Sequence, residues 1–144
     1  MLCEGAFHLM ETHEMNFKIL ESAASALMLG GKLIFTILNT LFPLFHSVKD
    51  FMDANAGESV IKYDGLSFDL MTIRDHNITS VDDDSGVARE LRCDERYYAP
   101  SEITLMLSSL GIRTIGIFGA ELGAFSRKDR LMTEDFEILV VAEK

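Results

Sequence analysis

Hydrophobic and polar positions alternate with two different periods along this chain. Between residues 12 and 29 apolar side chains recur every fourth residue, which predicts an amphipathic helix packed on a sheet. Thr12 is suited to cap its start, and Gly30-Gly31 to end it. Lys32–Leu38 is almost continuously apolar, as in a strand buried on both faces. The stripe that we expect to face the sheet consists of Met15, Ile19, Ala23 and Leu27, with Leu20 and Ala26 beside it.

The remaining regular pattern predicts two further helices and two further strands. Pro43 fits the first turn of a helix running to about residue 54, and Pro100 fits the first position of another, which Gly111 would end. We expect strands over residues 113–118 and 136–142, with a long loop over 119–133 between them. The continuous apolar character of the last strand suits a central place in a sheet.

Residues 59–98 have a different character from the rest of the chain. Residues 67–73 and 87–98 alternate with period two, and the cluster at 82–86 is rich in turn-forming residues. We predict two or three antiparallel strands, with residues 78–81 as the middle one, inserted as a hairpin or meander into a single α/β domain spanning residues 1–144. The side chains that we expect this insertion to bury include Phe68, Leu70, Leu91 and Tyr97.

Composition narrows the class of protein. The 144 residues suffice for one domain, and a formal net charge of −10 argues against a nucleic-acid partner, since no basic stripe offsets it. The longest apolar-rich stretch is too short to span a membrane, and no basic segment precedes an apolar run at the start. Cys3 and Cys93 have no framework spacing, which favours free thiols in a reducing compartment. We therefore expect a cytoplasmic protein without membrane contact.

The order of these elements resembles the carboxy-terminal half of a class I S-adenosylmethionine-dependent methyltransferase. Three passages carry the resemblance. Residues 2–7 (LCEGAF) are similar to the end of that fold's fourth strand, and residues 96–103 (RYYAPSEI) are similar to the entry to its last helix. Residues 27–33 (LMLGGKL) are similar to its Gly-Gly turn, with Leu29 in place of the usual proline. The resemblance implies a partial Rossmann-like sheet in which the last strand is antiparallel and lies between the other two.

One feature of the resembling family is missing from the sequence. No GxGxG loop, the motif through which that fold contacts its cofactor, occurs in the 144 residues, and only three residues precede the polar Glu4. We therefore expect the chain to begin at the tail of a strand, with about half of the fold absent. On its own, such a chain should bind S-adenosylmethionine weakly or not at all.

The resemblance also implies site residues. The segment after the first strand would face the cofactor, and either of two side chains there, Glu4 or His8, could accept a proton from the methyl acceptor. The same segment could equally be a loop with ordinary polar residues, and one tyrosine of the implied acceptor pocket could pack in the core instead. The implied cofactor contacts are Cys3, Glu4, Gly5 and Phe7, and the implied pocket for a small-molecule acceptor comprises Phe42, His46, Arg96, Tyr97 and Tyr98.

Two functions of different classes stay open. The first is a methyltransferase, or the carboxy-terminal remnant of one, acting on a small molecule. The second is a non-catalytic protein whose half-sheet is completed by a second copy or by a partner chain. A two-fold homodimer would cover the sheet edge left open at residues 1–4 or at Lys32–Leu38. His8, Glu11, His13 and Glu14 do not have metal-ligand spacing, so we expect no metal.

Overall fold

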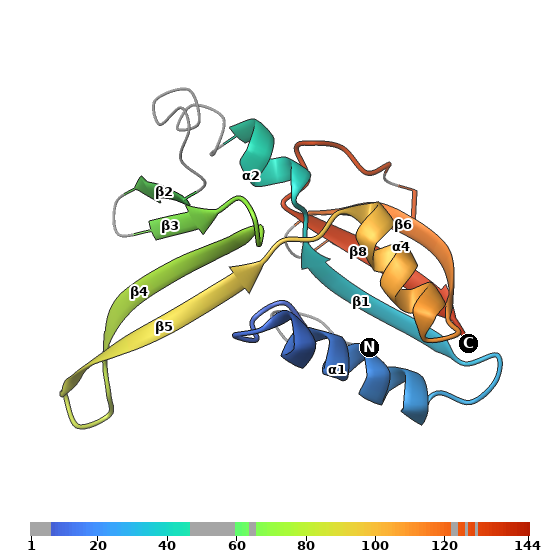
Figure 1. Cartoon of the computed structure of the whole chain (residues 1–144), viewed down its shortest axis with the longest axis horizontal. Helices are drawn as coiled ribbons and strands as arrows, with labels where there is room; N and C mark the ends of the chain where they lie inside the picture. Colours follow the sequence, from blue (N-terminus) through green and yellow to red (C-terminus); the bar gives the residue numbers. More distant parts are fainter. Residues whose placement is uncertain (1–6, 47–59, 64–65, 122–123, 126, 129) are drawn as a thin grey trace.

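The chain folds into a helix-covered sheet and a smaller second sheet (Figure 1). The computed structural model describes residues 7–46, 60–63, 66–121, 124–125, 127–128 and 130–144. The expected strand at residues 1–4 and most of the expected helix to residue 54 lie outside them. The elements are α1 (His13–Ala26), β1 (Lys32–Leu38), α2 (Leu41–His46), β2 (Val60–Tyr63), β3 (Leu66–Asp69), β4 (Arg74–Asp82), β5 (Ala88–Arg96), α4 (Pro100–Ser109), β6 (Arg113–Glu121), β7 (Ala124–Phe125) and β8 (Glu137–Glu143).

The main sheet has the order β1-β8-β6-β7, and β8 runs antiparallel to both of its neighbours. This confirms the predicted central, antiparallel last strand. A central strand buries both faces, and residues 138–142 of β8 are all buried. β1 and β6 are parallel to each other but separated by β8. All ladders between the described strands are antiparallel, and an isolated bridge between Asn39 and Tyr98 is parallel.

Helices α1 and α4 cover the same face of the main sheet. Leu20 from α1 and Ile103 and Leu107 from α4 pack against the side chains of Phe35 in β1 and Val140 in β8. This apolar layer is the principal core. A helix-covered sheet of this kind agrees with the predicted α/β class, although the expected Rossmann-like arrangement is not complete within these residues.

The predicted stripe of α1 is wrong by one position. Asn16, Leu20 and Ala24 face the core, whereas Met15 is 45% exposed and Ile19, Ala23 and Leu27 lie at the margin. A polar residue can occupy the buried row because its amide is satisfied: Asn16 Nδ2 donates to the Tyr98 hydroxyl (2.9 Å), and its Oδ1 accepts from the Met10 N–H (3.1 Å).

The two ends of α1 differ in how well the local sequence predicts them. The Thr12 hydroxyl accepts a hydrogen bond from the Met15 N–H (3.2 Å), as predicted for the N-cap of α1. The helix ends at Ala26 with an extended Leu27 as C-cap, earlier than the predicted stop at Gly30. Gly30 does adopt the left-handed conformation (φ 77°), in the turn where its N–H bonds the Lys144 carbonyl.

The insertion forms a second sheet with the order β2-β3-β4-β5, four antiparallel strands where two or three were predicted. Phe68 and Tyr97 are buried as expected and pack with Leu38 at the end of β1, which joins the two sheets. Leu91 is 51% exposed, so its predicted burial is wrong. It pairs with Thr79 of β4 in the exposed first part of β5, and the β4–β5 hairpin extends away from the main sheet (Figure 1).

The long loop predicted over residues 119–133 is wrong in its first part. β6 continues to Glu121 and pairs with β7 in a short hairpin at the sheet edge. The small residues that suggested a loop allow close packing instead: a Cβ added at Gly119 would clash with the Asp135 carboxylate. Among the helices of the described residues, none is long and apolar enough to cross a membrane.

Candidate functional site

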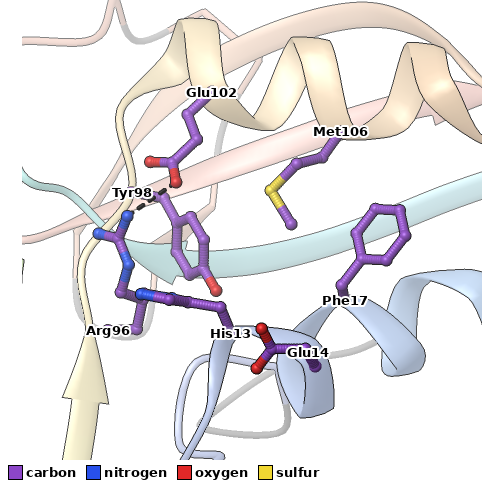
Figure 2. A pocket seen from close by; sticks show the side chains of 7 residues that line it. All are labelled: His13, Glu14, Phe17, Arg96, Tyr98, Glu102 and Met106. Atoms are coloured by element: carbon purple, nitrogen blue, oxygen red, sulfur yellow. Dashed lines mark hydrogen bonds and ion pairs between the residues drawn. The ribbon is translucent and has the colours of Figure 1, made fainter. Parts of the chain in front are cut away.

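A cleft of about 360 Å³ opens between α1 and α4 beside the last residues of β5 (Figure 2). Phe17 and Met106 form an apolar end, and Arg96 with Glu102 forms a charged end. Such a mixture of apolar walls and a few fixed polar groups is typical of small-molecule sites. The complete lining consists of His13, Glu14, Phe17, Arg96, Tyr98, Glu102 and Met106.

Arg96 is the most firmly held of these side chains. Its Nη2 donates to Glu102 Oε1 (2.7 Å), its Nη1 donates to the carbonyls of Tyr97 and Ile73, and its guanidinium carbon lies 4.7 Å from the centroid of the Tyr98 ring. The side chain is only 8% exposed. Burial lowers the pKa of Arg96 and the Glu102 carboxylate opposes that shift, so the residue stays a cation that is fixed in direction.

Tyr98 forms the floor of the cleft. Its ring stacks on Phe7 with a centroid distance of 5.0 Å, and its hydroxyl accepts from Asn16. Burial raises the pKa of Tyr98 to about 12, so the phenol is neutral at physiological pH and retains its proton as a donor.

His13 and Glu14 present the two proton-accepting groups of the cleft from the first turn of α1. Partial burial, together with the cations Arg96 and Arg74, lowers the pKa of His13, so its imidazole is neutral at physiological pH. The backbone N–H of Glu14 and the Thr12 hydroxyl lower the pKa of the Glu14 carboxyl. A neutral imidazole beside a fixed cation can take a proton from a bound nucleophile.

The five residues predicted to share an acceptor pocket do not do so. Arg96 and Tyr98 line the cleft, whereas Tyr97 packs on Phe68 and Phe136 on the opposite side of the chain. Alternation along extended backbone explains the separation, because successive side chains point to opposite faces. Both tyrosines are buried in core clusters, Tyr98 in the principal core and Tyr97 in the smaller one, and Tyr98 also lines the cleft.

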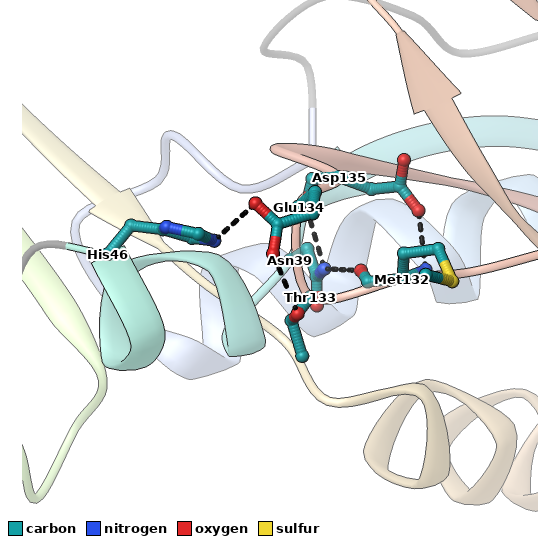
Figure 3. Close-up of polar contacts among 6 residues, drawn as sticks. All are labelled: Asn39, His46, Met132, Thr133, Glu134 and Asp135. Atoms are coloured by element: carbon teal, nitrogen blue, oxygen red, sulfur yellow. Dashed lines mark hydrogen bonds and ion pairs between the residues drawn. The ribbon is translucent and has the colours of Figure 1, made fainter.

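Phe42 and His46 belong to a third place, at the end of α2. The Phe42 ring meets Phe136 edge to face (5.2 Å), and His46 Nε2 lies 3.0 Å from the Glu134 carboxylate (Figure 3). These contacts tie α2 to the segment before β8. Neither side chain lines the cleft, so of the five residues predicted for the acceptor pocket the cleft brings together Arg96 and Tyr98.

The residues predicted around the cofactor divide into two groups. Cys3, Glu4 and Gly5 lie outside the described residues. Phe7 is 1% exposed and packs in the main core, and His8 is also buried, with no partner for its Nδ1 in the described structure and its carbonyl accepting from the Arg96 N–H (2.9 Å). Burial lowers the pKa of His8 to about 4. Neither side chain lines the cleft.

The sequence reasoning missed five lining residues, of which His13 is chemically the most useful. Its position could have pointed to it, because the first turn of a helix that is expected to follow a strand lies at the sheet edge where open α/β sheets bind ligands. Glu102 could have been found in the same way, as the acidic residue in the first turn of α4. Among the described residues, no group of three or more His, Cys, Asp or Glu side chains is placed to hold a metal ion.

Comparison with solved structures shows which fold this is. No family model matches the chain, and no curated protein matches it in sequence. The CcbJ methyltransferase from Streptomyces caelestis matches 98% of this chain and 58% of its own length, with 14% identity and a TM-score of 0.66. The chain has part of a methyltransferase fold.

Two further methyltransferases show the same likeness. An S-adenosylmethionine-dependent methyltransferase from Clostridium acetobutylicum ATCC 824 matches 99% of this chain and 57% of its own, at 13% identity and a TM-score of 0.59. The glycopeptide N-methyltransferase MtfA, bound to S-adenosyl-L-homocysteine, matches 99% and 53%, at 15% identity and a TM-score of 0.50. The chain thus spans a little over half the length of each of these methyltransferases.

Proposed function

We propose that the chain is the acceptor-binding part of an S-adenosylmethionine-dependent methyltransferase that acts on a small molecule. The observation that carries this proposal is the match of 98% of the chain to a methyltransferase that is itself covered to 58%. The cleft between α1 and α4 supplies what an acceptor site needs: an apolar end, a fixed cation and a neutral imidazole.

In this proposal the cleft residues act on the acceptor. Phe17 and Met106 hold its apolar portion, and Arg96, locked by Glu102, orients a polar group. His13 takes the proton that an attacking amine or hydroxyl releases, because partial burial and the nearby cations keep the imidazole neutral and thus able to accept it.

The described residues do not fit the cofactor. Phe7 and His8 are buried, and no glycine-rich loop occurs in the sequence. We therefore derive no step through S-adenosylmethionine. The alternative function is a non-catalytic chain with a methyltransferase fold whose sheet another polypeptide completes.

The cofactor prediction is tested on the chain as it stands. Titration with S-adenosylmethionine in a calorimeter is expected to give weak binding or none, because each missing hydrogen bond to a preformed partner removes about 0.5–1.5 kcal/mol and several are missing together. The S-adenosylmethionine-dependent methyltransferase from Clostridium acetobutylicum, titrated in parallel, is the positive control. Saturable binding at micromolar cofactor would contradict this prediction.

The proposed function itself needs a catalytic readout. If the genomic DNA upstream of Met1 encodes a glycine-rich strand–turn–helix in frame, the extended chain should transfer labelled methyl groups to amine or hydroxyl acceptors. Substituting His13→Gln in that protein should lower the transfer rate, while Thr104→Ala on the exposed face of α4 should leave it unchanged. An extended protein that binds the cofactor but transfers no methyl group would favour the non-catalytic alternative.

A further inference from the structure

The hairpin of β4 and β5 extends away from the main sheet and has an open edge (Figure 1). β5 is the outermost strand of the second sheet, and its first five residues, 88–92, are exposed. An exposed strand at a sheet edge offers its backbone N–H and C=O groups to another strand. The outer edge of β5 is therefore a place where another strand can pair.

The hydrogen-bond pattern fixes which backbone groups face outward. Bonds from the Tyr97 N–H to the Ile73 carbonyl and from the Asp83 N–H to the Val87 carbonyl bracket the β4–β5 ladder, so odd-numbered residues of β5 bond to β4. The backbone N–H and C=O groups of the even-numbered residues point away from β4. At Arg96, the N–H on this outer side donates to the His8 carbonyl. The outward groups of Ala88, Glu90, Arg92 and Asp94 have no backbone partner among the described residues.

The side chains along this edge alternate in a self-complementary way. Glu90 and Arg92 share one face of the strand, are exposed, and have no ion-pair partner in the described part of the chain, whereas Arg89 on the other face pairs with Asp83 (2.8 Å). Leu91 lies between them and is exposed on the face opposite to theirs. An acidic and a basic residue two positions apart can each meet the other when a strand pairs with its own antiparallel copy.

We propose that β5 pairs antiparallel with β5 of a second copy of this chain, with the two-fold axis at Leu91. In this register Glu90 lies opposite Arg92 of the second copy, and Arg92 lies opposite its Glu90. These are the residues with outward backbone groups, so each pair also exchanges two N–H···O bonds. Leu91 meets its own counterpart in the close, non-hydrogen-bonded position on the axis, and the two sheets become one continuous sheet.

Two other edges fit a second copy less well. The outward part of β4, residues 78–82, carries one charged side chain, Asp82, and no cation to meet it. At β1, the edge expected from the sequence, the Leu38 carbonyl already accepts from the Tyr98 N–H, and residues 35–38 are buried. Of these three edges, β5 is the one that combines open backbone groups, exposed side chains and complementary charge.

Charge exchange tests the register without depending on any enzymatic activity. Sedimentation velocity of the wild-type chain should give a mass of about twice 16.1 kDa. Glu90→Arg alone, or Arg92→Glu alone, places like charges opposite each other twice per dimer and should raise the dissociation constant about tenfold or more. The double variant Glu90→Arg with Arg92→Glu restores both pairs and should restore the dimer. A monomeric wild type, or a dimer that neither single variant weakens, overturns the proposal.

Disulfide trapping tests the axis itself. In a background with Cys3→Ser and Cys93→Ser, Leu91→Cys places two thiols at a spacing that a disulfide accepts, so mild oxidation should give a covalent dimer. Ile78→Cys, an equally exposed position on β4, is the matched control and should remain uncrosslinked. Crosslinking at Ile78→Cys but not at Leu91→Cys would overturn the proposal by assigning the interface to β4.

Discussion

Replacing Asn39 by alanine is expected to lower the free energy of unfolding by ~2–4 kcal/mol, because three partly buried backbone groups lose their hydrogen-bond partner. Asn39 is 0% exposed at the end of β1 (Figure 3). Its Nδ2 donates to the carbonyls of Asp135 (2.8 Å) and Met132 (3.4 Å), and its Oδ1 accepts from the Leu41 N–H (3.1 Å). One side chain therefore joins β1, α2 and the segment before β8.

Two variants separate this hydrogen-bonding role from simple loss of volume. Asn39→Asp keeps the acceptor for Leu41 but faces two carbonyls with a second acceptor, so it should also destabilise the fold. Ser22→Ala, which removes an exposed hydroxyl bonded only to Lys18 of its own helix, should change stability by no more than about 0.5 kcal/mol. Urea denaturation at neutral pH measures all three. An Asn39→Ala variant as stable as Ser22→Ala would contradict the prediction.

Acidification is expected to destabilise the fold through His8 by up to ~3 kcal/mol between about pH 6.5 and pH 4. Burial lowers the pKa of His8 to about 4, whereas the unfolded chain has the ordinary value of 6.5. Between these values the unfolded state binds the proton and the folded state does not. The contribution is thus fully present above pH 6.5 and is lost as the pH falls to 4.

The measurement is the difference in unfolding free energy between the wild type and His8→Gln across that range. The difference isolates His8 from Asp75 and Glu95, whose pKa values burial raises and whose protonation acts in the opposite direction. His13→Gln is the matched control and should show a much smaller pH-dependent difference, because His13 is exposed. Equal slopes for wild type and His8→Gln would show that the buried imidazole does not control acid stability.

The sequence predicted some of the residues that line the cleft and not others. Arg96 and Tyr98 were found because the passage around them resembles the entry to a methyltransferase helix. His13 and Glu102 were not, because a polar residue in the first turn of a helix is ordinary helix chemistry. Only the meeting of α1 and α4 places the two helix starts on one cleft with Arg96 between them.

The sequence by itself determined the local features of the fold. The features at Thr12, Pro100 and Gly111 follow from backbone chemistry within a few residues and occur where predicted, whereas Gly30 forms a left-handed turn after a helix that has already ended at Ala26. The apolar run Lys32–Leu38 is a strand for the same reason, since a continuous apolar stretch of that length can be buried on both faces.

Which of several similar rows of side chains is buried was decided only by the tertiary structure. The two adjacent rows of α1 are similarly apolar, and the row containing Asn16 is buried only because Tyr98, 82 residues away, satisfies its amide. His8 is buried because other elements pack around it, whereas Leu91 is exposed because no described element covers it. Such choices depend on partners distant in the sequence, and neither periodicity nor composition encodes those partners.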